Sequence, residues 1–160
     1  MLGRTLEPEV MDSVAEAVDY DAMDHSAVNR VFVDDLLAAG LTAAPDAPPA
    51  GDFPRVLDVG TGTAQIPIEL CRRQSEVHVV AVDLAVEMLR IAGRNVTAAS
   101  LQSRISLERV DAKRLNFADR SFDAVISNSI VHHIADPGPV LGEMLRVLRP
   151  EGRLFVRDLL

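Results

Sequence analysis

The chain has a single cysteine, no long apolar run and no excess of positive charge, and each absence excludes a class of protein. Because Cys71 is the only cysteine among 160 residues, an internal disulfide is impossible, which suits a reducing compartment. No N-terminal stretch has the apolar core of a signal peptide, and no run is long enough to span a bilayer. We therefore expect a cytoplasmic protein, without a membrane partner, in which Cys71 is a small buried apolar residue.

The net charge of −8 disfavours nucleic acid as a partner, because an acidic surface repels phosphate backbones. No run of basic residues is longer than a pair such as Arg72–Arg73. Apolar residues make up 48% of the chain and charged residues 25%, which is typical of a globular domain. A chain of 160 residues is long enough for one domain with a substantial core.

Two helices are predicted in the first quarter of the chain. Residues 8–24 look helical and acidic, and a second helix is predicted from an N-cap at Ser26 to Gly40. The apolar face of this second helix is predicted to hold Val28, Val31, Phe32 and Leu36. Residues 41–54 contain four prolines and several alanines, a composition typical of a linker. The predicted division is a helical segment, a linker and a main domain, at 1–40, 41–54 and 55–160.

From residue 55 onward, short apolar runs alternate with helical patterns. Strands are predicted at 56–59, 78–82, 105–110, 122–127 and 153–156. Helices are predicted at 64–73, 86–99 and 137–148, the last with Asp136 as its N-cap and Pro137 as its first residue. Near-continuous apolar strands indicate a sheet that is covered on both faces. Strands alternating with helices therefore predict an α/β fold with a doubly wound, mostly parallel sheet of about five strands.

The turn after the first predicted strand reads Asp58-Val59-Gly60-Thr61-Gly62-Thr63-Ala64. Small residues at such a turn let a ligand approach the backbone closely, and the turn lies at the carboxyl ends of the strands, where ligands bind. A dinucleotide fingerprint has its third glycine at the position that Gln65 occupies here. A nicotinamide-dependent reductase is therefore an alternative that Gln65 argues against.

This turn resembles motif I of the class I S-adenosylmethionine (AdoMet)-dependent methyltransferases, acidic-x-Gly-x-Gly-x-Gly, with Ala64 in the last small position. Further segments resemble the same family in the same order, at 80–83, 110–112, 122–128 and 145–154. Each segment alone is a weak signal, but together they are specific and cover residues 55–160. The resemblance implies a Rossmann-like AdoMet-binding core and methyl transfer to a small-molecule acceptor.

The resemblance also implies where the amino-acid end of AdoMet would bind. The backbone from Val59 to Gly62 would form a cradle, and Asp58 would orient the ammonium group directly or through water. In similar enzymes N-terminal helices cover the pocket as a lid, and a tyrosine there contacts the cofactor, which here is Tyr20. A solvated helix end is an equally good interpretation of Tyr20. Asn128, at the end of the fourth strand segment, is predicted to contact the cofactor as well.

The adenosine part of AdoMet would lie against the second and third strand segments. Asp83 would accept the two ribose hydroxyl protons, although it could instead cap the following helix. Leu84 would cover one face of the adenine. Asp111 would accept from the exocyclic amine of the adenine and the Ala112 amide would donate to a ring nitrogen, although Asp111 could instead cap a turn.

Methyl transfer is a direct displacement, so proximity and alignment supply much of the rate and a base is optional. The loop after the fourth strand segment contains His132 and His133, and in the family this loop lines the methyl site. Either histidine is therefore a candidate base, and packing in the pocket wall is the alternative. Adjacent histidines without cysteine or carboxylate partners do not make a zinc site, so no metal is predicted.

The family's sheet has two more strands after the fifth, whereas this chain stops at Leu160. Residues 154–156 would then form an exposed apolar sheet edge, which is an association hazard. We therefore expect either a truncated methyltransferase or an edge that a second copy or a partner covers. A non-catalytic AdoMet-binding fragment or subunit is the alternative to an enzyme.

Overall fold

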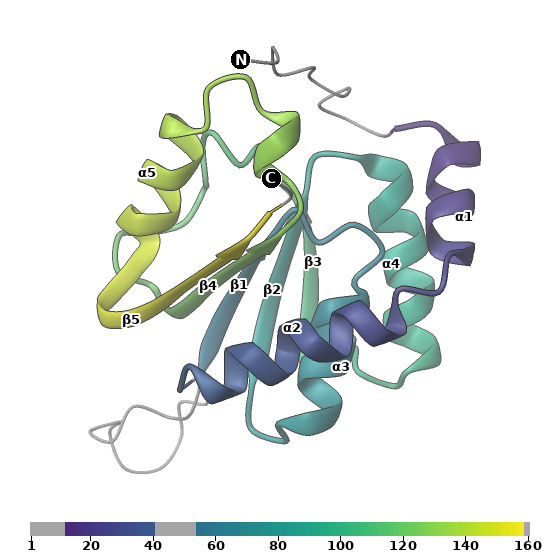
Figure 1. The fold of residues 1–160 in the computed structure, drawn as a ribbon, viewed down its shortest axis with the longest axis horizontal. Coiled ribbons are helices and arrows are strands. Elements are labelled where there is room, and N and C mark those ends of the chain that lie inside the picture. Colours follow the sequence, from purple (N-terminus) through teal and green to yellow (C-terminus); the bar gives the residue numbers. More distant parts are fainter. Residues whose placement is uncertain (1–11, 41–53, 159–160) are drawn as a thin grey trace.

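The computed structural model describes residues 12–40 and 54–158 and shows a five-stranded sheet between two layers of helices (Figure 1). All neighbouring strands run parallel, in the order β3-β2-β1-β4-β5. The strands are β1 (Arg55–Val59), β2 (His78–Asp83), β3 (Ile105–Arg109), β4 (Phe122–Asn128) and β5 (Leu148–Arg157). The predicted α/β fold is confirmed, and the first four strands lie within one residue of their predicted ends.

Helices cover both faces of the sheet, as the apolar strands predicted. One face packs against α2 (Ser26–Ala38), α3 (Gln65–Arg73) and α4 (Val86–Ala98). The other face packs against α5 (Gly138–Val147), which the sheet separates from those three helices (Figure 1). Alternate strand residues serve the two cores, so that Val56 points into the first and Leu57 into the second.

The N-terminal helices pack against the α/β core. Phe32, Val33 and Leu36 of α2 are buried in the larger apolar core. Helix α1 (Val14–Ala22) contacts α4 through the buried Ala17. The predicted linker lies outside the described residues apart from Pro54, so the division into lid, linker and domain stays a prediction. Within the described ranges, no helix is long and apolar enough to cross a membrane.

The start of the first helix was predicted wrongly. Helix α1 begins at Val14, because Ser13 and Glu16 form a capping box, and residues 8–11 of the predicted helix lie outside the described residues. The Glu16 N–H donates to Ser13 Oγ at 3.2 Å, and the Ser13 N–H donates to Glu16 Oε2 at 3.2 Å. This Ser-x-x-Glu pattern is a sequence signature of a helix start. The prediction did not use it, because the acidic residues begin before Ser13 and the helix was predicted from them.

Three other predicted helix starts are each one residue off, and one of them is α3, which begins at Gln65 instead of residue 64. Ser26 is the first residue of α2 and not its N-cap, whereas Pro137 is the N-cap of α5 and not its first residue. In both helices an aspartate placed two residues before the first helical residue accepts that residue's N–H. Asp24 Oδ1 accepts from Ser26 and Asp136 Oδ1 accepts from Gly138, each at 3.0 Å. Each aspartate thus stabilises its helix start from two residues before the first helical residue, whereas an N-cap lies one residue before it.

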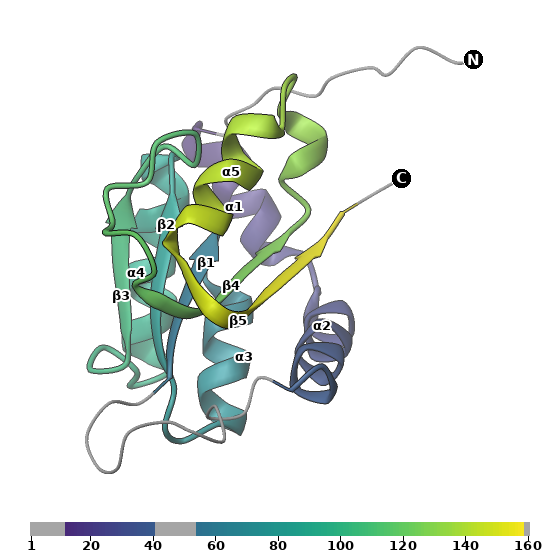
Figure 2. The same cartoon turned by 90° about the vertical axis from the view of Figure 1, so that its left-hand side faces the viewer.

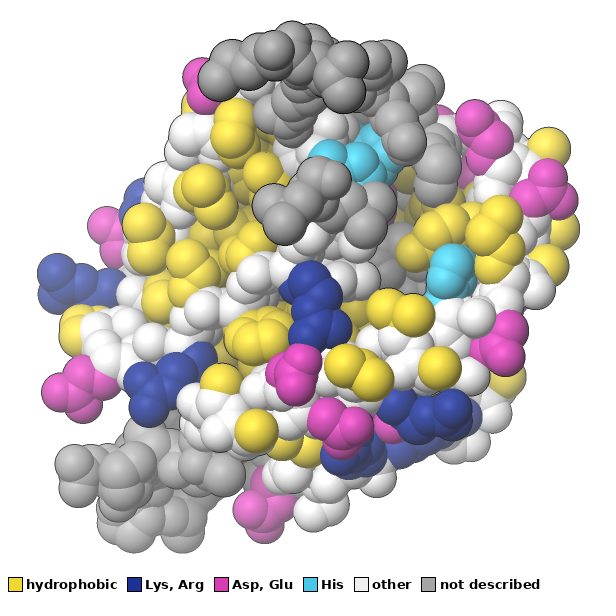
Figure 3. Space-filling view, viewed as in Figure 1, with side chains coloured by type: hydrophobic (Ala, Val, Ile, Leu, Met, Phe, Trp, Pro, Cys, Tyr) yellow, Lys and Arg dark blue, Asp and Glu magenta, His cyan; other side chains and the backbone are white. Residues whose placement is uncertain are grey.

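Strand β5 lies at the sheet edge within the described part of the chain (Figure 2). Helix α2 covers one of its faces, with the ring of Phe155 packed edge-on against Phe32 at 5.0 Å and Arg157 paired with Asp35. Val156 is 36% exposed, and Leu145 of α5 is exposed as well. Hydrophobic side chains gather over this α5–β5 side of the molecule (Figure 3). The partner predicted for this edge stays a prediction.

Candidate functional site

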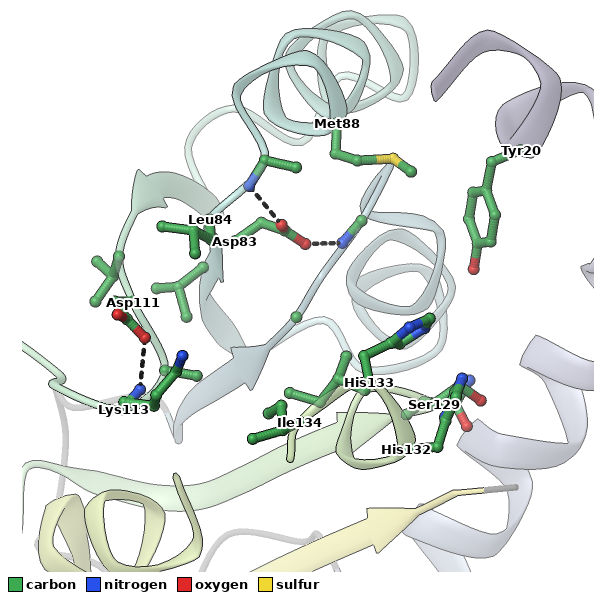
Figure 4. Close-up of a pocket in the computed structure, with 18 of the residues that line it drawn as sticks. Tyr20, Asp83, Leu84, Met88, Asp111, Lys113, Ser129, His132, His133 and Ile134 are labelled. Carbon is green, nitrogen blue, oxygen red and sulfur yellow. Dashed lines mark hydrogen bonds between the residues drawn. The ribbon is translucent and has the colours of Figure 1, made fainter. Parts of the chain in front are cut away.

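A pocket of about 440 Å³ opens at the carboxyl ends of β1, β2 and β4 (Figure 4). The strand order reverses between β1 and β4, and doubly wound sheets bind ligands at this switch point. The volume lies within the range of small-molecule sites. Its walls come from the turn after β1, the ends of β2 and β4, the segment after β3, and the α1–α2 region.

The turn after β1 requires its glycines. Gly60 and Gly62 have φ values of +75° and +56°, in the left-handed region that side chains disfavour. A Cβ on Gly60 would also lie 2.2 Å from Cγ2 of Ile130, in the loop after β4. The loop therefore closes directly onto the turn, and only glycine fits at position 60.

Asp83 ends β2 and holds the glycine turn in place. Its Oδ2 accepts the Gly62 N–H at 2.8 Å and its Oδ1 accepts the Ala85 N–H at 2.9 Å (Figure 4). Burial raises the pKa of this carboxyl, and the backbone N–H groups partly oppose the shift. Asp83 thus accepts the N–H of Ala85, which is the N-cap residue of α4, but makes no side-chain cap bond to the helix itself. A carboxylate has about four lone-pair sites, so two remain for a ligand.

Asp58 lies deeper than Asp83, with only 2% of its surface exposed. Burial raises its pKa to about 7, Thr61 opposes the shift and the nearby Asp83 charge adds to it. Asp58 and Thr61 border a chamber of about 30 Å³ that adjoins the large pocket. The two cavities share Tyr20, Gly60 and Asn128 in their walls.

Tyr20 comes from α1, and its ring projects toward the pocket (Figure 4). Its ring centroid lies 4.9 Å from that of His25. Burial raises the pKa of the Tyr20 hydroxyl, and the Asp58 and Asp83 charges raise it further. The next residue, Asp21, ties α1 to the core, since its Oδ1 accepts from Gln65 Nε2 at 3.2 Å and from Asn95 Nδ2 at 2.8 Å. Tyr20 is therefore part of the pocket wall and not a solvated helix end.

The segment after β3 forms the wall beside β2. Leu84 and Ala112 line it, and Asp111 lies exposed at its rim. Asp111 Oδ1 accepts the Lys113 N–H at 2.9 Å, which is the turn-capping role considered for it (Figure 4). A side chain that caps a turn through one oxygen still presents its other oxygen to a ligand.

The loop after β4 brings the two histidines to the opposite wall. His132 and His133 lie in a 3₁₀ helix, η1 (Val131–His133), with ring centroids 4.0 Å apart. Both carboxylate oxygens of Asp158, just after β5, contact His132: Oδ1 lies 2.5 Å from Nδ1, and Oδ2 accepts the backbone N–H at 3.0 Å. Asp158 thus fixes the ring and leaves Nε2 as the nitrogen away from the carboxylate. In the described ranges, no three metal-ligating side chains cluster.

Comparisons with known proteins identify the family. Residues 57–156 match the family described as a methyltransferase domain, which is more than half of the chain. The chain belongs to this methyltransferase family. Similar relatives include a demethylmenaquinone methyltransferase of Deinococcus radiodurans, 44% identical over 104 residues. Another is a ubiquinone/menaquinone biosynthesis C-methyltransferase of Geotalea daltonii, 34% identical over 105 residues.

The matched segments cover 65% of this chain but only 42% and 45% of those two methyltransferases, so the chain spans under half of each relative. Solved structures share the fold. A protein from Methanococcus maripaludis superposes with a TM-score of 0.79, is 20% identical and covers 98% of this chain and 67% of its own. The [4+2]-cyclase SpnF has a TM-score of 0.68, is 28% identical and covers 84% of this chain and 46% of its own.

Most of the residues predicted for a methyltransferase site converge on the large pocket. Its walls contain Tyr20, Gly60, Gly62, Asp83, Leu84, Asp111, Ala112, Asn128, His132 and His133. Asp58 and Thr61 border the small chamber instead. Val59 is fully buried in the core, where its carbonyl accepts the Ser127 hydroxyl at 2.8 Å, and it lines neither cavity.

Sequence reasoning missed other residues of the site. His25 and Asn29 line both cavities, and Val28 lines the larger one. Their contribution depends on how α2 docks on the core, which no local pattern encodes. Asp158 was also missed, although an acidic residue directly after the last predicted strand lies at the sheet end where a site is expected.

Proposed function

We propose that this chain binds AdoMet and transfers its methyl group to a small-molecule acceptor. The observation that carries the proposal is the Asp83 carboxylate, held by the glycine turn in a pocket at the sheet's switch point. The chain belongs to a methyltransferase family. This membership, together with the arrangement of the pocket, favours methyl transfer over the hydride transfer of a nicotinamide-dependent reductase. The similar cyclase shows that the fold alone does not decide the reaction, so the pocket residues must support it.

The pocket residues fit AdoMet in size and chemistry. AdoMet has no pyrophosphate, and the walls of the pocket contain one Lys and no Arg within the described residues. The two remaining lone-pair sites of Asp83 suit the ribose hydroxyls. Leu84 and Val110 offer an apolar slot for the adenine, with Asp111 at its rim. The buried Asp58 suits a positively charged amino group, which would replace its proton.

The N-terminal helices would cover the bound cofactor. Tyr20, His25 and Val28 line the pocket, with Tyr20 on the side away from Asp111 (Figure 4). The Asp21 bonds to Gln65 and Asn95 hold α1 in this position. The helical segment therefore acts as a lid that is anchored to the α/β core rather than as a separate domain.

We propose further that His132 is the general base and that Asp158 positions it. Bound AdoMet supplies a methyl group activated by the positive charge on sulfur. His132 would accept the proton of an acceptor hydroxyl through Nε2, and Asp158 would stabilise the resulting imidazolium. This arrangement suits acceptors that become nucleophilic by losing a hydroxyl proton. Two relatives whose names specify quinone methylation support acceptors of this class.

Transfer of tritium from methyl-labelled AdoMet tests the proposal. A suitable acceptor probe is 1,4-dihydroxynaphthalene, with a panel of phenols beside it. We expect His132→Gln and Asp158→Asn to lower turnover by about 10²-fold or more, with affinity for S-adenosylhomocysteine unchanged. Unchanged turnover in both variants would contradict the role of the base. If the chain binds AdoMet but methylates nothing in the panel, the non-catalytic alternative is favoured.

A further inference from the structure

The small chamber beside Asp58 collects buried polar groups that lack partners. Three side-chain atoms are buried without a hydrogen bond among the described residues, and their residues all line this chamber: His25 Nε2, Thr61 Oγ1 and Thr63 Oγ1. Thr63 as a whole is only 1% exposed. Buried polar atoms are rarely left unsatisfied, because the loss of water costs free energy that no new bond returns. Three such atoms at one chamber therefore indicate a polar ligand.

The charges around the chamber define the ligand further. Asp58 is a carboxyl group buried at its wall, and no Lys or Arg is among the described residues that line it. His25, which also lines the chamber, is the N-cap of α2, and a helix N-terminus favours negative charge. The walls of the chamber thus combine a carboxyl group that suits a positive charge with donors that suit a negative charge. A zwitterion satisfies both sides.

We propose that His25 and Thr63 bind the carboxylate of the cofactor's amino-acid end, while Asp58 receives its ammonium group. The proposal rests on the function proposed above. The chamber, of about 30 Å³, adjoins the large pocket through Tyr20 and Asn128, so a polar group that enters it can belong to a ligand whose remainder lies in the large pocket. Since His25 belongs to the helical lid and Thr63 to the glycine turn, a carboxylate bound to both residues connects the lid to the turn. The lid thereby selects ligands with an intact amino-acid end.

The test compares two ligands that differ only in the carboxylate, AdoMet and decarboxylated AdoMet. Their dissociation constants are measured by calorimetry for the full chain and for three variants. His25→Phe keeps a ring against Tyr20 but removes the N–H donor, and Thr63→Val removes the hydroxyl at nearly constant volume. His25→Gln restores an N–H donor. His78→Phe, at the opposite end of β2 from the pocket, is the matched control.

We expect His25→Phe to weaken AdoMet binding by about 10- to 100-fold, as for a hydrogen bond to a charged group. Binding of decarboxylated AdoMet should change by less than about twofold. Thr63→Val should show the same ligand dependence, His25→Gln should recover most of the loss, and His78→Phe should change neither constant.

Equal weakening of both ligands would overturn the inference, because it would mean that His25 only shapes the pocket. No change with either ligand would also overturn it, because the chamber would then hold a buried water molecule. If the unaltered chain, shown to be folded by thermal unfolding, binds neither ligand, the proposed function itself fails. That outcome is distinct from the first two, in which AdoMet binding by the unaltered chain is intact.

Discussion

The backbone N–H of Gly62 donates to Oδ2 of Asp83 at 2.8 Å, which joins the turn after β1 to the end of β2. Position 62 has φ +56°, and the bond depends on this left-handed backbone. The carboxylate that is expected to hold the ribose is therefore oriented by the same turn that is expected to cradle the rest of the cofactor. Neither element forms the site alone, and a change in one should be felt by the other.

Substitution of Gly60 tests the close contact between the turn and the loop after β4. Gly60→Ala should lower the free energy of unfolding by about 1–3 kcal/mol, because it adds backbone strain and a 2.2 Å contact with Ile130. It should also weaken S-adenosylhomocysteine binding. Urea unfolding and calorimetry measure the two effects.

Gly142 provides the matched control for Gly60. It lies inside α5, and a Cβ there would meet nothing within 4 Å. Gly142→Ala should therefore raise the free energy of unfolding by about 0.5–1 kcal/mol, since alanine favours the helix. A destabilised Gly142→Ala variant, or a neutral Gly60→Ala variant, would contradict the described backbone.

The protonation of Asp58 should make stability depend on pH. Its folded pKa is about 7 against 3.8 in the free side chain, so the unfolded chain loses the proton first as the pH rises. Asp58 then contributes about 4 kcal/mol to the free energy of unfolding below pH 4, and this contribution is lost as the pH rises from 4 to 7. Asp58→Asn should remove this pH-dependent contribution to the free energy of unfolding. Urea unfolding of both proteins across this range should show their difference changing with pH, and a constant difference would count against a buried neutral Asp58.

Ligand binding should release this proton. An ammonium group beside Asp58 favours the ionised carboxylate, so binding of S-adenosylhomocysteine at pH 6 should expel a proton into the buffer. The binding enthalpy would then vary with the ionisation enthalpy of the buffer, and at pH 8 this variation should vanish. Asp58→Asn should abolish it at pH 6. Buffer-independent enthalpies at pH 6 would show that the ammonium group lies elsewhere.

Arg104 should contribute strongly to stability. Its guanidinium donates to the carbonyl of Cys71 in the last turn of α3, and to those of Gln74 and Val77 between α3 and β2. Arg104→Ala should lower the free energy of unfolding by about 1–3 kcal/mol, because partly buried carbonyls lose their donors. The control is Arg90→Ala, which removes an exposed pair with Glu87 and should cost at most about 0.5 kcal/mol. Similar losses in the two variants would contradict this account.

The strands could be predicted because their signals are local. Three of the first four are short apolar runs and β3 alternates apolar with polar residues, so their ends follow from the residues within them. Strand β5 begins at Leu148, five residues earlier than the predicted Arg153. The prediction began too late because Pro150 argues against a strand when the position in the sheet is unknown. Proline is excluded from central strands but accepted at an edge, and the pairing between β4 and β5 shifts its register there. Whether a strand lies at the centre or the edge of its sheet is decided by tertiary structure and is not encoded in its local sequence.

The faces of the helices were less predictable than their positions. Val28 and Val31 were expected in the core with Phe32, yet they are 55% and 51% exposed, while Val33 is buried. Val28 instead lines the pocket. An apolar stripe does not reveal whether it serves a core or a ligand site, because both exclude water.

The candidate site was predictable where a sequence motif carries it. The glycine turn, Asp83 and the loop with the histidines each follow directly from a strand. His25 and Asp158 do not, since His25 depends on the docking of α2, and Asp158 meets His132 across 26 residues of sequence. Contacts of this kind arise from tertiary packing and leave no local pattern.

Calorimetric titration with AdoMet and S-adenosylhomocysteine tests the central claim most directly, with NAD as the control ligand and Asp83→Asn beside the unaltered chain. We predict that both adenosyl ligands bind, that NAD does not, and that Asp83→Asn weakens both by about tenfold or more, as for a hydrogen bond to a charged group. A folded chain that binds neither adenosyl ligand, or an Asp83→Asn variant that binds both as well as the unaltered chain does, would contradict the account.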